Sequence, residues 1–391
     1  MTTTFDITKR AAAAFVAAVA LVPPVLSVSP AAAAVTPQSG FALPAPSGRY
    51  AVGRDVLHLV DQSRPDPWVP EDRRELMVSM YYPASAGTGR PAAYLTTTEA
   101  SLFIEARAMA GVEPEALSGT RTAARGQAQP RWGRYPLVIL TPGITLHRHT
   151  LTHLAEELAS RGYVVASVDH AYESVGTAFP GGRVLACTAC TVLGNTDEED
   201  QPAAIAGLAT GRAQDITFVL DRLTAATPAW RHAGLIDRGR IGMAGHSIGG
   251  NATAATMATD SRVDAGLNMD GTFFAPVPAD GLNGRPFLLL GTPAHSPGGA
   301  DVTWDRDWRS LDGWKRWLTV TGTEHFDYSD IAVLADQAGL PDTASPLPGD
   351  RTAQIVRDYV GAFFDLHLRG IARPLLDGPD AGHPEVVFHQ P

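Results

Sequence analysis

Short apolar segments that alternate with helical segments, from residue 136 to residue 368, restrict this chain to a small number of folds. Strands that are rich in Val, Ile and Leu over their whole length are typical of a parallel sheet covered by helices on both faces. The expected strands are 136–140, 163–168, 240–244, 263–269, 285–290 and 317–321, and the expected helices are 151–161, 205–224, 249–258 and 352–368. Ligands of such sheets bind beyond the carboxyl ends of the strands.

Two earlier segments, 52–60 and 75–82, alternate apolar and polar residues on either side of a turn-rich stretch, which predicts two antiparallel strands. A helical segment at 99–110 is expected to cap the fold. The predicted fold class is therefore α/β, with a mostly parallel central sheet, antiparallel N-terminal strands and helices on both faces. We expect one domain at 51–370, with insertions at about 84–134, 171–203 and 292–312, and a C-terminal tail at 371–391.

The N-terminal residues have the pattern of a secretory signal rather than of a folded segment. A basic pair precedes an apolar run at 11–26, and four alanines at 31–34 provide the small residues that a signal peptidase accepts. Two prolines shorten the run to less than the roughly 20 residues of a spanning helix, which disfavours a retained membrane anchor. We expect a signal peptide at 1–34, a secreted protein, and a flexible leader at 35–50.

The charge balance excludes one large class of partners. The sequence has 31 Lys and Arg residues against 41 Asp and Glu residues, for a net charge of −10, and no basic stripe offsets this balance. Because binding to phosphate backbones depends on clustered cations, nucleic acid is not an expected partner.

The chain has two cysteines, Cys187 and Cys190, separated by two residues. A structural zinc site needs four ligands, and no second Cys/His pair stands at a matching spacing, so no metal is expected. A thioredoxin-like redox pair would suit a reducing compartment. In an exported protein the same pair favours a disulfide that closes a small loop.

A serine between two glycines marks the junction of the strand 240–244 and the helix 249–258. This arrangement of Gly245, Ser247 and Gly249 is that of a nucleophile elbow, in which a tight turn lifts the hydroxyl clear of the sheet. The two glycines provide the space that this turn needs. The start of the helix also stabilises negative charge that develops near the serine.

A serine hydroxyl needs a base to accept its proton, and His325 has the best position for this role. It follows the strand 317–321 and a short turn, so it lies at the same edge of the sheet as Ser247. We expect His246, next to the serine, to point away and fill space. The other histidines after the serine are expected to be surface residues: His295, His367, His383 and His389.

The acid that orients the base has two placements in the sequence. Asp270 ends the strand 263–269, whereas Asp301, Asp305 and Asp307 follow the next strand through a Pro/Gly-rich stretch. A strand terminus holds a side chain more rigidly than a loop, which favours Asp270.

Two backbone amides are expected to stabilise the oxyanion. One belongs to Ile248, the residue after the nucleophile, and the other to Ile144, in the loop after the strand 136–140. Gly143 would allow this loop to approach the serine closely. An ordinary Pro-Gly turn is the alternative for this loop.

Three segments together resemble a known family: Arg-Tyr-Pro-Leu-Val-Ile-Leu-Thr-Pro-Gly-Ile at 134–144, Leu-Ala-Ser-Arg-Gly-Tyr-Val-Val-Ala-Ser-Val-Asp-His at 158–170, and Gly-His-Ser-Ile-Gly-Gly at 245–250. They are similar to the plasma-type platelet-activating factor acetylhydrolases and their bacterial relatives, within the α/β-hydrolase superfamily. The resemblance extends from about Val52 to Leu368.

The resemblance implies a role for each candidate site residue. It implies Asp270 rather than Asp301 as the acid, His325 in a Gly-x-x-His turn as the base, and the amides of Ile144 and Ile248 as the oxyanion donors. Relatives often have Ser-His-Gly where this chain has Thr-Pro-Gly at 141–143, so the surroundings of the oxyanion loop differ. The loops at 171–200 and 292–301 have no evident counterpart and are expected to shape the acyl and leaving-group pockets.

The function expected is that of a serine esterase that transfers an acyl group to water without a metal or cofactor. The resemblance implies a short or oxidised sn-2 acyl chain on a phospholipid as substrate, with transient contact to a lipid interface. No strongly amphipathic basic helix indicates tight membrane attachment. Alternatives within the same fold are a polyester or cutinase-like hydrolase, a general lipase, a peptidase and an acyltransferase. A non-catalytic binding protein would require a lost triad member, and every member has a candidate here.

Overall fold

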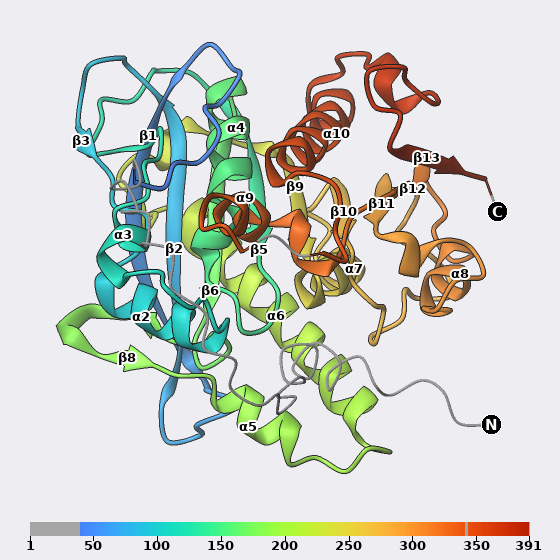
Figure 1. Cartoon of the computed structure of the whole chain (residues 1–391), viewed down its shortest axis with the longest axis horizontal. Coiled ribbons are helices and arrows are strands. Elements are labelled where there is room, and N and C mark those ends of the chain that lie inside the picture. Colours follow the sequence, from blue (N-terminus) through green and yellow to red (C-terminus); the bar gives the residue numbers. More distant parts are fainter. Residues whose placement is uncertain (1–39, 341–342, 391) are drawn as a thin grey trace, which may run out of the picture.

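The computed structural model describes residues 40–340 and 343–390, so the expected signal peptide and the start of the expected leader lie outside the described residues. One eleven-stranded sheet crosses the molecule in the order β13-β12-β11-β10-β9-β5-β6-β2-β1-β4-β3 (Figure 1). Its strands are β1 (Ala51–Pro65), β2 (Arg73–Ala84), β3 (Arg90–Pro91), β4 (Arg125–Gly126), β5 (Tyr135–Thr141), β6 (Val164–His170), β9 (Ile236–His246), β10 (Ala265–Met269), β11 (Phe287–Gly291), β12 (Lys315–Val320) and β13 (Val386–His389).

The centre of the sheet is parallel. Strands β6, β5, β9, β10, β11 and β12 pair in parallel with one another in this order, which confirms the mostly parallel sheet predicted from the apolar runs. Strands β10 and β11 are buried along their full length, as expected where helices cover both faces. The carboxyl ends of these parallel strands lie along one edge of the sheet, where ligands bind in such folds.

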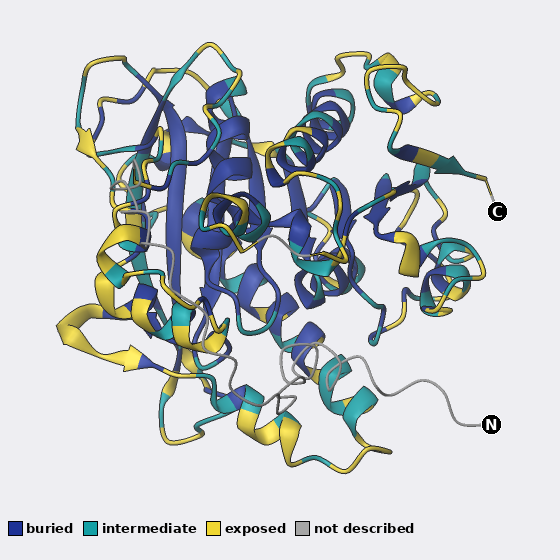
Figure 2. Ribbon diagram, in the orientation of Figure 1, coloured by how far each residue is buried: buried dark blue, intermediate teal, exposed yellow. Residues whose placement is uncertain are grey.

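Helices cover the two faces of the sheet (Figures 1 and 2). Side chains that alternate along a strand point to opposite faces. In β5, Leu137 and Ile139 belong to the core beneath the helices of one face, whereas Val138 and Leu140 belong to the core of the other face. The first core includes helices α6 (Gln201–Thr224) and α7 (Ile248–Thr259), and the second includes α4 (Thr152–Arg161) and α10 (Gly349–Arg369), against which α9 (Asp330–Gln337) packs.

Antiparallel strands extend the parallel centre at one side. Strand β1 pairs antiparallel with β2, and β2 pairs antiparallel with β6. This arrangement confirms the two N-terminal strands predicted from their alternating pattern. The short strands β3 and β4 continue the sheet beyond β1.

The segment expected to be a C-terminal tail contributes to the sheet instead. Strand β13 pairs antiparallel with β12, from Val320↔Val386 to Trp317↔His389. Turn-forming residues between 370 and 385 obscured this short strand in the sequence. The tail also includes a 3-10 turn (Pro374–Leu376), whose Leu376 is fully buried.

The described part of the expected leader, 40–50, packs on the domain, so the prediction of a flexible arm is wrong there. Phe41 and Leu43 are buried in an apolar cluster with Phe103 and Leu146. Backbone and hydroxyl groups of Ser47 donate hydrogen bonds to the Glu157 carboxylate at 2.7 and 2.5 Å. Burial of these two apolar side chains offsets the flexibility that the Pro/Ser/Gly composition predicts.

The insertions contain short elements. The first has β3, α2 (Thr97–Ala106), α3 (Pro114–Ser118) and β4; the second has β7 (Thr177–Ala178), β8 (Val184–Leu185) and α5 (Thr188–Gly194); the third has a 3-10 turn (Pro293–His295) and α8 (Thr303–Trp308). The predicted helix 99–110 ends early because Ala108 adopts a positive φ of 49°. A disulfide joins Cys187 to Cys190 at the start of α5. Among the described residues, no helix combines the length and apolar character that crossing a membrane requires.

Candidate active site

Ser247 stands in a sharp turn between β9 and α7. Its backbone has φ 58° and ψ −129°, a conformation that non-glycine residues rarely adopt, and its amide donates to the carbonyl oxygen of Met269 at 2.8 Å. A Cβ atom at Gly245 would lie 2.0 Å from the carbonyl oxygen of Gly249, and one at Gly249 would lie 2.3 Å from that of Thr141. Both glycines are therefore required by the close approach of backbone segments, as the elbow pattern predicts.

Asp270 directly follows β10 and is buried. Its backbone has φ 57°, and its amide donates to the carbonyl oxygen of Leu290 at 3.0 Å. Nδ1 of His325 donates to Oδ2 of this carboxylate across 2.6 Å. Burial alone would raise the pKa of Asp270, but His295 and His325 hold it well below its usual value. The carboxylate is thus ionised, and it fixes the tautomer of His325 that leaves Nε2 as the proton acceptor.

His295 lies in the interior, which corrects the prediction of a surface residue. Its Nδ1 donates to Oδ1 of Asp270 at 2.8 Å, and its Nε2 lies 3.0 Å from Oδ2 of Asp301. Burial opposes protonation, but the two carboxylates outweigh it and raise the pKa of His295 to about 9. The Pro/Gly-rich loop folds back over β11 and carries this histidine beneath the site, so the loop composition was a poor guide to exposure. Asp301, the alternative acid, pairs with His295 instead of His325.

His246 is buried beside His325 rather than directed away from it. The two ring centroids are 4.8 Å apart, and Nε2 of His246 donates to the backbone carbonyl of His325 at 2.7 Å. Burial, aided by the neighbouring His325, lowers the pKa of His246 to about 3, so this ring is neutral. The expectation that His246 fills space holds, but it also fixes the turn that carries His325.

The two predicted oxyanion amides lie on either side of Ser247. Ile248 is the first residue of α7, so its amide has no acceptor within the helix. Gly143 passes close to the serine, because a Cβ atom there would lie 3.1 Å from Cβ of Ser247, and Ile144 is the next residue. Within the described ranges neither amide donates a hydrogen bond. Two free donors and the positive end of a helix therefore belong to the segments next to Ser247.

Comparisons with known proteins find similarity to ester hydrolases. A family model described as platelet-activating factor acetylhydrolase, isoform II, matches residues 35–180. A probable 1-alkyl-2-acetylglycerophosphocholine esterase of Arthroderma benhamiae is 29% identical over 90% of this chain and 94% of its own length. A bis(hydroxyethyl) terephthalate hydrolase of Streptomyces coelicolor is 29% identical over 31% of this chain and 28% of its own. A solved ferulic acid esterase from Streptomyces cinnamoneus is 41% identical, with a TM-score of 0.77, over 90% of this chain and 100% of that one.

The chain belongs to the α/β-hydrolase superfamily. It is a carboxylic ester hydrolase related to the platelet-activating factor acetylhydrolases. The fold class and the family predicted from the sequence are both confirmed.

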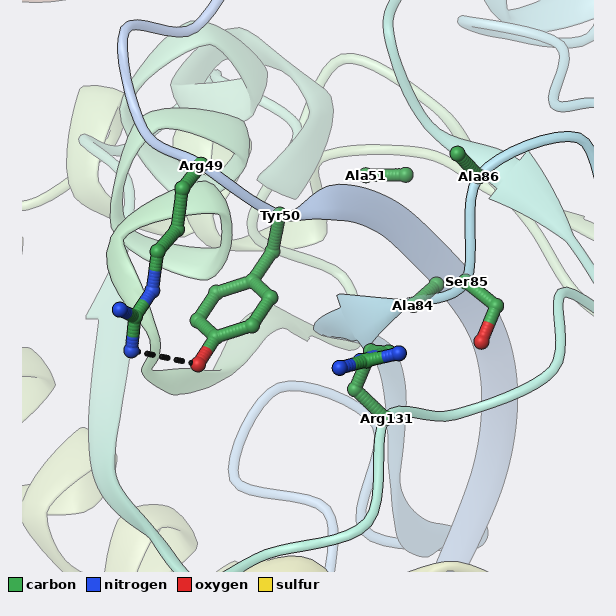
Figure 3. Close-up of a pocket in the computed structure, with 7 residues that line it drawn as sticks. All are labelled: Arg49, Tyr50, Ala51, Ala84, Ser85, Ala86 and Arg131. Atoms are coloured by element: carbon green, nitrogen blue, oxygen red, sulfur yellow. Dashed lines mark hydrogen bonds between the residues drawn. The ribbon is translucent and has the colours of Figure 1, made fainter.

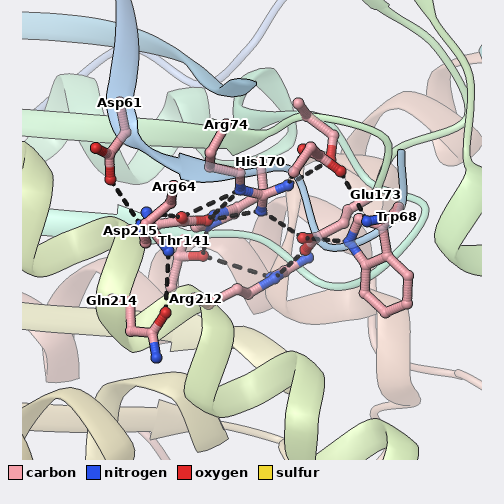
Figure 4. A network of polar contacts seen from close by, with 12 residues as sticks. Asp61, Arg64, Trp68, Arg74, Thr141, His170, Glu173, Arg212, Gln214 and Asp215 are labelled. Atoms are coloured by element: carbon pink, nitrogen blue, oxygen red, sulfur yellow. Dashed lines mark hydrogen bonds and ion pairs between the residues drawn. The ribbon is translucent and has the colours of Figure 1, made fainter. Parts of the chain in front are cut away.

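A buried polar network lies under the loop of the hydrolase that carries Ile144 (Figure 4). Arg212, from α6, donates to the carbonyl oxygen of Pro142 and, through Nε, to Oε2 of Glu173 at 2.7 Å. The backbone carbonyl of Glu173 in turn accepts from the amide of Thr145 at 2.8 Å. These bonds hold the loop on both sides of Ile144.

The same network continues to the centre of the sheet. Arg74 in β2 pairs with Glu173 and Asp215, and Nδ1 of His170 lies 2.7 Å from Oδ2 of Asp215. Nε2 of His170 bonds to the hydroxyl of Thr141 at 2.9 Å. Burial alone would raise the pKa of Asp215, but Arg74 and His170 lower it far below its usual value. The sequence analysis did not predict these residues, although charged side chains within an apolar strand and an apolar helix face were an available signal.

Apolar side chains surround the two predicted oxyanion residues of the hydrolase. Partly buried residues from four segments pack with Ile144 and the buried Ile248: Trp68, Leu193, Ile205, Ala206 and Phe274. Leu193 lies on α5, just after the disulfide. The second insertion thus contributes to an apolar wall beside the serine, as expected for a loop that shapes a substrate pocket.

A separate hollow of about 730 Å³ opens far from this chemistry (Figure 3). It is lined by Arg49, Tyr50, Ala51, Ala84, Ser85, Ala86 and Arg131. These residues lie near the amino end of β5, at the edge of the sheet opposite to Ser247, so the hollow takes no part in the site. Within 40–340 and 343–390, no group of three or more His, Cys, Asp or Glu residues is arranged to hold a metal ion.

Proposed function

We propose that this enzyme is an exported serine esterase that acts through an acyl-enzyme on Ser247. One observation carries the proposal: the His325–Asp270 hydrogen bond of 2.6 Å stands at the same sheet edge as a serine held in an elbow. This is the base–acid arrangement that activates a serine, with two free amides beside it.

In the proposed acylation step, Oγ of Ser247 attacks the ester carbonyl while Nε2 of His325 accepts the hydroxyl proton. Negative charge develops on the carbonyl oxygen, where the amides of Ile144 and Ile248 donate to it. Asp270 stabilises the imidazolium that forms. The tetrahedral intermediate then collapses, the C–O bond to the alcohol breaks, and His325 returns the proton to the leaving alkoxide.

In the proposed deacylation step, a water molecule replaces the alcohol. His325 accepts a proton from this water as its oxygen attacks the acyl carbon, and the same two amides hold the second oxyanion. Collapse of the intermediate releases the carboxylic acid and returns the proton to Oγ of Ser247. The cycle needs no group beyond the side chains and amides of this chain.

The proposed substrates are esters with a short acyl group, and a short-acyl glycerophospholipid is the first candidate. The relative from Arthroderma benhamiae, named for such an esterase, supports it because the alignment covers nearly the full length of both chains. An aromatic ester such as a ferulate is the second candidate. The 41% identity to a ferulic acid esterase and the aromatic side chains Trp68 and Phe274 beside Ile144 favour it.

Export is proposed from two features. The basic pair, apolar run and alanines at the N-terminus have the pattern of a cleaved signal, and the Cys187–Cys190 disulfide suits an oxidising compartment. Cleavage near residue 34 in the secreted protein, measured by N-terminal sequencing, tests this part of the proposal.

Hydrolysis of a p-nitrophenyl ester series, a short-acyl phosphatidylcholine and methyl ferulate tests the function. Ser247→Ala should lower kcat by about 10⁴-fold or more on every ester that the enzyme accepts, whereas Ser118→Ala, in α3, should leave it unchanged. Amides and alcohol acceptors in the same assay separate a peptidase or an acyltransferase from an esterase. Wild-type turnover that persists in folded Ser247→Ala would contradict the assignment of the nucleophile.

A further inference from the structure

Arg107 lies between the two loops that carry the reacting groups. It follows the last residue of α2, and its guanidinium stacks on the ring of Phe326, with Cζ 4.0 Å from the ring centroid. Its Nη2 donates to the hydroxyl of Thr145 at 3.0 Å. Phe326 is the residue after His325, and Thr145 is the residue after Ile144, so this cation stands beside the site.

Arg107 is half-buried and has no carboxylate partner among the described residues, unlike the fully buried arginines. Arg74 pairs with three carboxylates, Arg148 pairs with Asp169, and Arg212 pairs with Glu173. Burial without such a partner lowers the pKa of Arg107 to about 10, which leaves it charged at neutral pH. A partly buried charge without a counter-charge is costly to keep. A charged group with a shifted pKa beside reacting residues is a mark of a ligand site.

The guanidinium of Arg107 has N–H donors that no described residue accepts. It carries five N–H groups, and the described residues accept one hydrogen bond from it. The other guanidinium nitrogens of Arg107 have no partner in the described part of the chain, but they are not shielded from water. They are therefore in contact with solvent. Stacking on Phe326 fixes the plane of the group, which pre-organises it for two parallel bonds to one anion.

We propose that Arg107 binds an anionic group of the ester substrate, a carboxylate or a phosphodiester, while the ester bond lies over Ser247. The proposal rests on the proposed esterase function and adds a charge preference to it. The two anions share one chemistry, two oxygens that accept from a planar fork, and differ in which side of the ester carries them. A carboxylate would belong to the acyl side, as in a half-ester of a dicarboxylic acid. A phosphodiester would belong to the alcohol side, as in a glycerophospholipid.

Two matched substrate pairs test the proposal and separate these sources. The first pair is 4-nitrophenyl hydrogen succinate and its neutral methyl ester, and the second is diacetylglycerophosphocholine and diacetylglycerol. For the wild type, kcat/KM should be at least tenfold higher for the member of one pair that carries the carboxylate or phosphodiester. Arg107→Gln should remove this ratio mainly through KM, by about tenfold, with little change for the neutral member. Arg107→Lys should restore part of the ratio, because it keeps the charge without the fork.

Arg49→Gln is the matched control. Arg49 also stacks on an aromatic ring, that of Tyr50, but at the opposite edge of the sheet, so this variant should keep the wild-type ratio. Thermal unfolding of each variant reports on folding. Equal loss of kcat/KM on both members of each pair in Arg107→Gln would overturn the proposal and leave Arg107 a positioning role. A wild-type ratio near one in both pairs would overturn it while the esterase function stands.

If the wild type hydrolyses none of these esters, the proposed function fails, and calorimetry decides the subsite separately. Glycerophosphocholine and succinate should then bind to the wild type and at least tenfold more weakly to Arg107→Gln. Equal binding of these probes to both proteins, or no binding to either, would overturn the proposal.

Discussion

One carboxylate holds two histidines: Nδ1 of His295 lies 2.8 Å from Oδ1 of Asp270, and Nδ1 of His325 lies 2.6 Å from Oδ2. The amide of Thr292 donates to Oδ1 as well, at 2.7 Å. Asp270 is therefore bound at both oxygens before any substrate arrives, and the proposed base is one of its two imidazole partners. Only His325 faces solvent, with 40% of its side chain exposed against 8% for His295.

The first prediction concerns the charge on His295. His295→Asn keeps a donor near Oδ1 of Asp270 but removes a positive charge from the neighbourhood of the base. A positive charge then no longer repels the proton that the base accepts. The acidic limb of the kcat/KM profile should therefore move to higher pH, and kcat/KM at acidic pH should fall by roughly several-fold. His383→Asn, whose histidine pairs with Asp358 and Asp380 away from the site, should leave the profile in place. An unshifted kcat/KM profile in a folded His295→Asn variant would contradict this prediction.

The second prediction concerns stability against pH. The pKa of His295 is raised from 6.5 to about 9 in the folded protein, so the folded state binds more protons than the unfolded state between these values. The stabilisation is fully present below about pH 6.5 and is lost as pH rises through about 9, and its size is on the order of 3 kcal/mol. The difference in unfolding free energy between wild type and His295→Asn, from urea titrations at pH 6 and pH 9.5, should shrink accordingly. A difference that stays constant would contradict it.

The third prediction concerns the space at the elbow. Gly249→Ala places a Cβ atom 2.3 Å from the carbonyl oxygen of Thr141, so α7 and the loop that carries Ile144 must separate. The variant should lose about 1–3 kcal/mol of stability and more than about tenfold in kcat. Gly207→Ala, at an exposed position of α6 where no atom lies within 4 Å of the new Cβ, should instead gain about 0.5–1 kcal/mol. Thermal melts and ester turnover measured side by side check both outcomes.

The fourth prediction concerns the network under the oxyanion loop. Arg212→Lys cannot reach both the carbonyl of Pro142 and the carboxylate of Glu173, so Ile144 should lose its fixed position. We expect kcat to fall by about 10- to 100-fold with little change in KM, because the oxyanion forms only during the reaction. Arg64→Lys is the control, since Arg64 joins the network through Asp61 and Asp215 without contact to the loop. An equal loss in both variants would argue for a general effect on folding.

The sequence predicted those features that depend on neighbouring residues. The strand, the tight turn and the helix around Ser247 are coded within a short segment, and the apolar runs determine the parallel strands. The positions of Asp270 and His325 also follow from this local order, because each comes directly after a buried strand.

Features that depend on distant segments were missed. His295 reaches Asp270 because the loop after β11 folds back, and composition alone made this loop look exposed. Arg74 and Asp215 are 141 residues apart, so no local pattern joins them. The same reason applies to β13 and to Phe41, whose partners lie far along the chain.

The sheet ends in short strands at both sides, since β3 has two residues and β13 has four. An unpaired strand edge is a template on which a second chain can add, and the risk grows with the length of the edge. Without β13, the edge would be β12, which has six residues, four of them buried in the interior. The C-terminal segment thus lowers the tendency of this large sheet to aggregate edge to edge.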